Sequence, residues 1–126
     1  MAGLTLDSGA LIAFERADRE VMRHLKEAQQ LGMDLTVPTA VVVEVWRGGS
    51  RSAQLARLLA ACVIEPLSDH LARIAGEAIG KVRGASVVDA VVMSSAAERG
   101  DRVLTCDPID LGRLRRWFPR VRLIAI

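Results

Sequence analysis

The sequence predicts an α/β fold in which a twisted parallel sheet is flanked by helices. Short apolar segments with the character of strands alternate with longer segments in which apolar residues recur at helical spacing. The strand segments contain few polar positions, as expected for strands that are covered on both faces. At 126 residues the chain is long enough for a substantial core, and we expect a single domain over residues 1–126.

The sheet is expected to contain about four to five strands. The candidate segments are short and apolar, and each ends at a turn or capping residue; they are residues 3–6, 34–37, 62–65, 102–105 and 121–126.

Helices are predicted between these strands, where capping residues precede apolar residues at a spacing of three to four. The expected ranges are 8–16, 18–30, 52–61, 68–83, 86–99 and 108–117. Residues 39–47 are ambiguous, because three consecutive valines favour a strand. We predict a helix there, since Pro38 closes the preceding strand and Thr39 is a suitable N-cap.

Composition and charge exclude several classes of protein. The net charge is only +2, so the chain as a whole is not a strongly basic nucleic-acid binder. Cys62 and Cys106 lack the spacing of a zinc site and are expected to be free thiols. We expect no signal peptide and no membrane span, and therefore a cytoplasmic protein. Local basic positions are candidates for phosphate contacts, namely Arg47, Arg51, Arg83, Arg113 and Arg116.

Four carboxylates stand in otherwise apolar surroundings. Asp7 and Asp107 follow predicted strands, and Glu44 and Asp89 lie in helices that follow strands or turns. Ligands of parallel sheets bind beyond the carboxyl ends of the strands, where these acids are expected to meet. Each aspartate has a structural alternative as a helix cap, and solvent exposure or an ion pair with Arg47 is the alternative for Glu44.

As a group, the acids indicate a metal site. Carboxylates gathered at one edge repel each other, and their pKa values rise unless a cation compensates them. Oxygen ligands suit Mg²⁺ or Mn²⁺. The two histidines, His24 and His70, give little support to a histidine-based metal site or a catalytic triad, and no glycine-rich phosphate loop follows a strand.

Around these acids the sequence resembles the PIN-domain nucleases, and more narrowly the VapC toxins of bacterial VapBC toxin–antitoxin pairs. The segments that carry the resemblance are LTLDSGALIAFER, VPTAVVVEVWRGG, SVVDAVVMSSA and VLTCDPIDL. The resemblance implies a three-layer PIN-like sandwich and Mg²⁺- or Mn²⁺-dependent endonucleolytic cleavage of structured RNA, such as tRNA or rRNA. It also implies a homodimer that a VapB antitoxin neutralises. Thr105 matches a supporting hydroxyl position, and Asp110 resembles a further acid of some members.

Phosphodiester hydrolysis suggests a role for each acid. We expect Asp7 and Asp89 to be the principal metal ligands and Asp107 to complete the metal's surroundings, while Glu44 orients or deprotonates the attacking water. The pattern of acids is compatible with either one or two bound metal ions. A phosphoacceptor receiver domain is disfavoured, because a second acid beside Asp7 is missing; a non-catalytic RNA- or protein-binding module on the same fold is the alternative.

Overall fold

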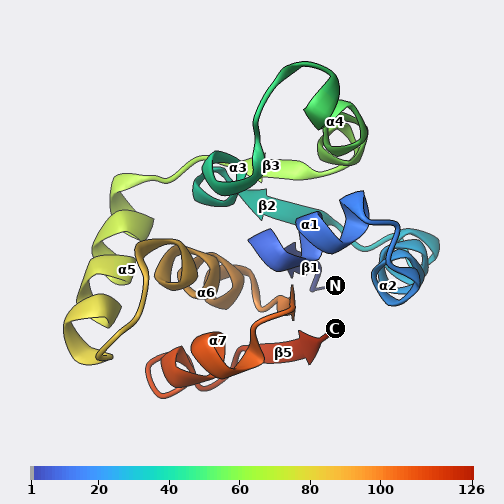
Figure 1. The fold of residues 1–126 in the computed structure, drawn as a ribbon. Coiled ribbons are helices and arrows are strands. Elements are labelled where there is room, and N and C mark those ends of the chain that lie inside the picture. Colours follow the sequence, from blue (N-terminus) through green and yellow to red (C-terminus); the bar gives the residue numbers. More distant parts are fainter. Residues whose placement is uncertain (1) are drawn as a thin grey trace.

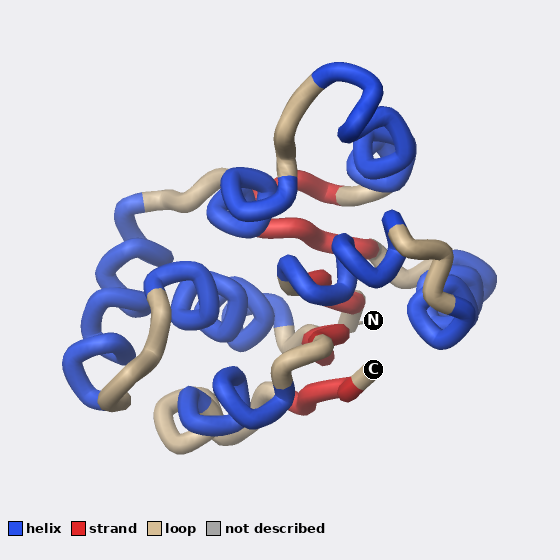
Figure 2. Tube along the Cα trace, in the orientation of Figure 1, coloured by secondary structure: helices blue, strands red, loops and turns tan. Residues whose placement is uncertain are grey.

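The computed structural model describes residues 2–126 and confirms the α/β fold. Five parallel strands form one sheet in the order β3-β2-β1-β4-β5, with helices around it (Figures 1 and 2). In Figure 1 the arrows of β2 and β5 point to opposite sides of the view although both strands run parallel to β1 and β4, which shows the twist of the sheet. The strands are β1 (Leu4–Leu6), β2 (Leu35–Pro38), β3 (Val63–Glu65), β4 (Arg102–Thr105) and β5 (Arg122–Ala125).

Two helical layers cover the sheet. Helices α1, α2 and α4 pack together on one side, and α5, α6 and α7 pack together on the other, while α3 contacts both α1 and α6. None of the helices in residues 2–126 is long and apolar enough to cross a membrane. The helices are α1 (Ser8–Glu15), α2 (Arg19–Gln30), α3 (Thr39–Val45), α4 (Ala53–Ala60), α5 (Asp69–Lys81), α6 (Val87–Arg99) and α7 (Pro108–Leu114), with a 3-10 turn at Gly49–Ser52.

The ambiguous segment after β2 is a helix, as predicted, although its cap differs from the prediction. Pro38 occupies the N-cap position without a side-chain hydrogen bond, and Thr39 is already the first helical residue. The Thr39 hydroxyl instead accepts a hydrogen bond of 3.2 Å from the Leu67 N–H. Tertiary contact with the loop after β3 has therefore replaced the local capping bond that the sequence suggested.

The strands differ in how deeply they are buried. β1 and β2 lie inside the sheet and are buried throughout, whereas the edge strand β3 is largely exposed, with Val63 at 51%. The apolar character of residues 62–65 predicted a covered strand, and this expectation was wrong. An edge strand has a neighbour on one side only, so its apolar composition does not determine its burial.

A buried polar network ties the start of β1 to the end of α6. The Asp101 carboxylate accepts hydrogen bonds from the Gly3 N–H at 2.7 Å, the Thr5 hydroxyl at 2.9 Å and the Arg99 Nε at 2.9 Å. Arg99 also donates to Thr5 and to Glu65, which belongs to β3. Within residues 2–126 no buried side-chain nitrogen or oxygen lacks a hydrogen-bond partner, and these bonds offset the cost of desolvating the cluster.

We predict that Arg99→Leu destabilises the fold strongly, because Asp101 would then be a buried carboxylate without its counter-charge. The expected loss lies toward the lower end of about 3–5 kcal/mol in the free energy of unfolding, since Arg99 is partly exposed. Arg73→Leu is the matched control: it breaks an exposed pair with Asp69 and should cost less than about 1 kcal/mol. Urea denaturation measures both, and equal losses would contradict the interpretation.

Candidate active site

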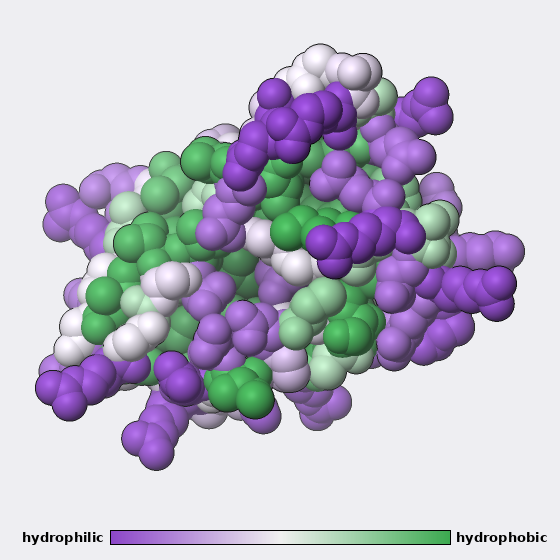
Figure 3. Space-filling model, viewed as in Figure 1, coloured by the Kyte–Doolittle hydropathy of each residue, from purple (hydrophilic) through white to green (hydrophobic). Residues whose placement is uncertain are grey.

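The four acids singled out by the sequence line one pocket at the carboxyl edge of the sheet. Its volume is about 400 Å³. The lining residues are Asp7, Ser8, Gly9, Glu44, Ser86, Val88, Asp89, Val92, Cys106, Asp107 and Asp110. Figure 3, viewed as in Figure 1, shows hydrophilic side chains collected near the centre of this face, between apolar regions. The structure therefore brings together all five predicted acids, including Asp110.

Asp7 marks the point where β1 ends and α1 begins. Its carboxylate accepts a hydrogen bond of 2.9 Å from the Ala10 N–H, so it caps α1 as the structural alternative proposed. The cap uses only the Oδ1 atom of the carboxylate, and the same side chain also lines the pocket. The residue is only 6% exposed. A capping role and a role in the pocket are therefore compatible at this position.

Burial is the main reason why the pKa of Asp7 rises from 3.8 to about 6. The Thr105 hydroxyl and the Ala10 N–H act in the opposite direction, and repulsion from Asp89 and Asp107 adds to the rise. A carboxyl group that holds its proton this firmly is a site where a nearby cation would be strongly favoured.

Asp89 lies in the first turn of α6, beside its N-cap. The Ser86 hydroxyl caps the helix by accepting a hydrogen bond of 3.0 Å from the Asp89 N–H. Burial raises the pKa of the Asp89 carboxyl, the Ser86 side chain lowers it, and the charges of Asp107, Asp110 and Glu44 raise it again. The carboxylates therefore repel one another across the pocket.

Asp107 sits at the N-cap position of α7 but makes no capping hydrogen bond with its side chain. The structural alternative proposed for this residue is thus not realised. Its N–H donates to the Thr105 hydroxyl at 2.8 Å, which helps to orient the loop after β4. Desolvation and the neighbouring Asp110 raise the pKa of Asp107, while Arg113 counteracts the rise.

Glu44 projects from α3 and is held by a residue that the sequence did not single out for this role. Its carboxylate accepts a short hydrogen bond from the Ser8 hydroxyl, which joins α3 to the start of α1. Of the two structural alternatives for Glu44, the residue is exposed to solvent and forms no ion pair with Arg47, whose guanidinium donates to the carbonyl oxygens of Val43, Glu44 and Trp46.

Gly9 is a second residue of the pocket that the sequence did not single out. A Cβ atom at this position would lie 2.8 Å from the Cβ of Cys106, which is closer than real contacts allow. Glycine therefore lets the start of α1 approach the loop after β4, and this approach brings Asp7 near Asp107. The only sequence signal was a glycine in the first turn of a helix that directly follows a strand.

The donor set fits a hard divalent cation, since carboxylate oxygens suit Mg²⁺ and Mn²⁺. Within residues 2–126, however, no three Asp, Glu, His or Cys side chains are already grouped closely enough to hold one ion together. Mg²⁺ usually keeps several waters and binds through one or two carboxylates. A pocket lined by separated acids is compatible with this mode of binding.

The fold and this pocket define the class of protein. The sequence matches the PIN domain family over residues 4–116, and the chain belongs to that family. No curated protein matches the sequence significantly.

Solved structures from toxin–antitoxin systems share the fold. VapBC2 from Rickettsia felis, bound to a promoter DNA fragment, superposes with a TM-score of 0.80 at 13% sequence identity, covering 98% of both chains. DNA-bound VapBC from Salmonella typhimurium gives 0.76 at 12% identity, with 99% and 98% covered. A toxin–antitoxin complex from Klebsiella pneumoniae gives 0.74 at 16%, with 98% and 97% covered. At these identities the likeness shows the fold alone.

We predict that Asp7→Asn stabilises the metal-free protein at neutral pH. Protonation of Asp7 stabilises the folded state; this contribution is fully present below pH 3.8 and is lost as the pH rises through about 6. At pH 7 the buried charge costs at most about 3 kcal/mol, whereas asparagine retains the cap without the charge.

The measurement is the melting temperature of both proteins in chelator at several pH values. The advantage of Asp7→Asn should grow between pH 4.5 and pH 7. An advantage that is independent of pH would contradict the assigned cause.

Proposed function

We propose that this chain is a metal-dependent endoribonuclease that acts as the toxin of a toxin–antitoxin pair. The observation that carries the proposal is the meeting of Asp7, Glu44, Asp89 and Asp107 in one pocket, although they come from four separate parts of the chain. The PIN family consists generally of nucleases, which agrees with this chemistry. The substrate class is structured RNA, such as tRNA or rRNA.

Each side chain has a role that follows from its position. Asp7 and Asp89, whose pKa values are raised by burial, would hold Mg²⁺ or Mn²⁺, and Asp107 would complete the metal's surroundings. When bound, the ion lowers the pKa of water and shields the phosphate charge. Glu44, held by Ser8, is the exposed base that orients or deprotonates the attacking water. Thr105 positions Asp107 through its backbone N–H.

The repulsion within the pocket supports a bound cation. Asp89 and Asp107 add to the raised pKa of Asp7, Asp107 adds to that of Asp89, and Asp110 adds to that of Asp107. A divalent ion would offset this repulsion and stabilise the fold. This stabilisation would be about 2.7 kcal/mol when the ion concentration is one hundred times its dissociation constant.

We predict that the chain degrades total RNA in Mg²⁺ or Mn²⁺ and that excess chelator stops the reaction. Asp7→Asn and Asp89→Asn should each reduce the rate by more than about 100-fold, because direct ligands matter more than the residues that support them. Asp69→Asn is the matched control, since this aspartate is exposed on α5 and pairs with Arg73. Gel analysis of RNA fragments measures the rates.

The same experiment separates the alternative function. A non-catalytic binding module would leave RNA intact, and divalent ions would not change its melting temperature. Undiminished cleavage by Asp7→Asn would refute the assigned roles even if the parent protein is active.

The partners of the proposed toxin are a VapB-type antitoxin and a second copy of the chain in a homodimer, in the cytoplasm. The similarity in fold to the toxin–antitoxin complexes described above supports the antitoxin partner. We predict that a small protein encoded in the adjacent reading frame co-purifies with this chain and suppresses its RNA cleavage. Co-expression with and without that frame, followed by the cleavage assay, measures this. Full activity in the co-purified complex would contradict the prediction.

A further inference from the structure

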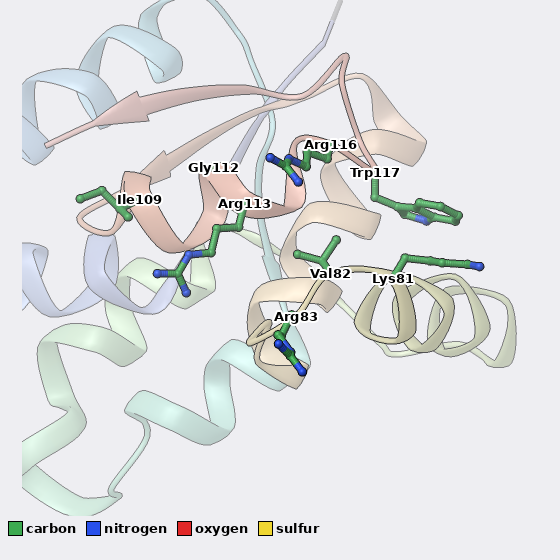
Figure 4. A pocket seen from close by; sticks show the side chains of 8 residues that line it. All are labelled: Lys81, Val82, Arg83, Ile109, Gly112, Arg113, Arg116 and Trp117. Carbon is green, nitrogen blue, oxygen red and sulfur yellow. The ribbon is translucent and has the colours of Figure 1, made fainter.

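A second hollow lies beside the acidic pocket and has the opposite charge. It is a groove of about 630 Å³ between the end of α5 and α7, which we call the basic groove. Figure 4 shows Lys81 and Trp117 toward one end of the groove and Ile109 and Arg113 toward the other. Its lining consists of Lys81, Val82, Arg83, Ile109, Gly112, Arg113, Arg116 and Trp117.

The groove gathers four cationic side chains and no acidic one. Lys81, Arg83, Arg113 and Arg116 all line it, and all are exposed. Of these four cations, only Arg113 forms an ion pair within residues 2–126, with Asp110 at 3.8 Å. Four like charges around one hollow repel each other, so the groove attracts an anion, and guanidinium groups are well suited to phosphate.

The groove also presents flat and apolar surface to solvent. The Trp117 side chain is 40% exposed and Ile109 is 74% exposed. Proteins that bind single-stranded nucleic acids combine exposed aromatic rings with cations, because the bases stack on the rings while the cations contact the phosphate backbone. An acidic peptide would satisfy the cations but would have no comparable use for the indole.

The basic groove and the acidic pocket are built on the same two segments. Helix α7 carries Asp110 in the pocket and Arg113 in the groove, and the turn after it carries Arg116 in the groove. The loop from α5 to α6 carries Arg83 in the groove and then Ser86 in the pocket. The Arg113 side chain reaches this loop, since a Cβ atom added at Gly84 would lie in ordinary contact, 3.6 Å, with an Arg113 guanidinium nitrogen.

We propose that the basic groove binds a single-stranded segment of the RNA substrate next to the phosphodiester bond held at the acidic pocket. Its cations contact the phosphates of this segment, and Trp117 stacks on one of its bases. The inference rests on the proposed function and extends it, since it assigns substrate binding to residues outside the set of acids. It also selects unpaired regions of a structured RNA as the part that is recognised.

The first test measures affinity without cleavage. A fluorescein-labelled 12-nucleotide single-stranded RNA of mixed sequence is titrated with the Asp7→Asn protein in chelator, and anisotropy reports binding. Lys81→Gln combined with Arg116→Gln should weaken binding roughly tenfold or more near 0.1 M salt and reduce the salt slope by about 1.4. Lys26→Gln combined with Arg57→Gln removes the same charge from exposed positions on α2 and α4 and should leave affinity within about twofold.

The second test concerns the stacking ring. Trp117→Leu should weaken binding by roughly fivefold to a hundredfold, whereas Trp117→Phe should retain most of the affinity because it keeps an aromatic face. Melting temperatures of both variants show that they are folded. In the active protein, the groove variants should raise KM more than they lower kcat, as expected for binding shared by the ground state and the transition state.

Three results would overturn the inference: groove variants that bind like the control pair, equal affinity for a duplex of the same length, or a glutamate 12-mer that binds more tightly than RNA and depends equally on Trp117. The last result would assign the groove to an acidic protein segment. Failure of the parent protein to cleave RNA in metal refutes the proposed function instead. Loss of affinity in the groove variants would then still support RNA binding, because it is measured in chelator.

Discussion

The cost of placing several negative charges at one edge of the sheet governs this structure. Asp7 is almost completely buried at the junction of β1 and α1, and burial keeps its pKa near 6. Its cap on α1 recovers part of that cost, and the Ser8 hydroxyl does the same for Glu44. The remaining repulsion is retained in the fold, and it costs stability in the metal-free protein.

In contrast to the acidic pocket, the charged residues near the start of β1 are paired with one another. Arg99, Asp101 and Glu65 form a network that is closed on itself through Thr5 and Ser95, with the donors and acceptors matched inside the protein. In the acidic pocket the negative charges exceed the positive ones, and in the basic groove the reverse holds. The charges of this network are paired with one another, whereas excess charge of opposite sign lines the acidic pocket and the basic groove, which meet at the Asp110–Arg113 ion pair on α7.

Most of the fold could be predicted because local signals agreed with the tertiary structure. Strand segments ended at acids or prolines, and Ser86 and Asp18 were suitable caps and do cap α6 and α2. The meeting of the acids followed from the geometry of parallel strands. Contacts between distant segments could not be predicted: the bond from Ser8 to Glu44 spans 36 residues, and the approach of Gly9 to Cys106 depends on how β1 and β4 pair. No periodicity in the sequence encodes such contacts.

The order of strands has a consequence for biosynthesis. The first strand, β1, can pair early with β2 through Leu4 and Leu35, but its second neighbour, β4, exists only when about four fifths of this sequence has been made. Loops of this length close slowly, and β5 must still be added beyond β4. Asp107 reaches the pocket only after this pairing. A nascent chain therefore lacks the complete set of pocket acids until β4 has paired with β1, and Asp107 is the last of the four to join the others.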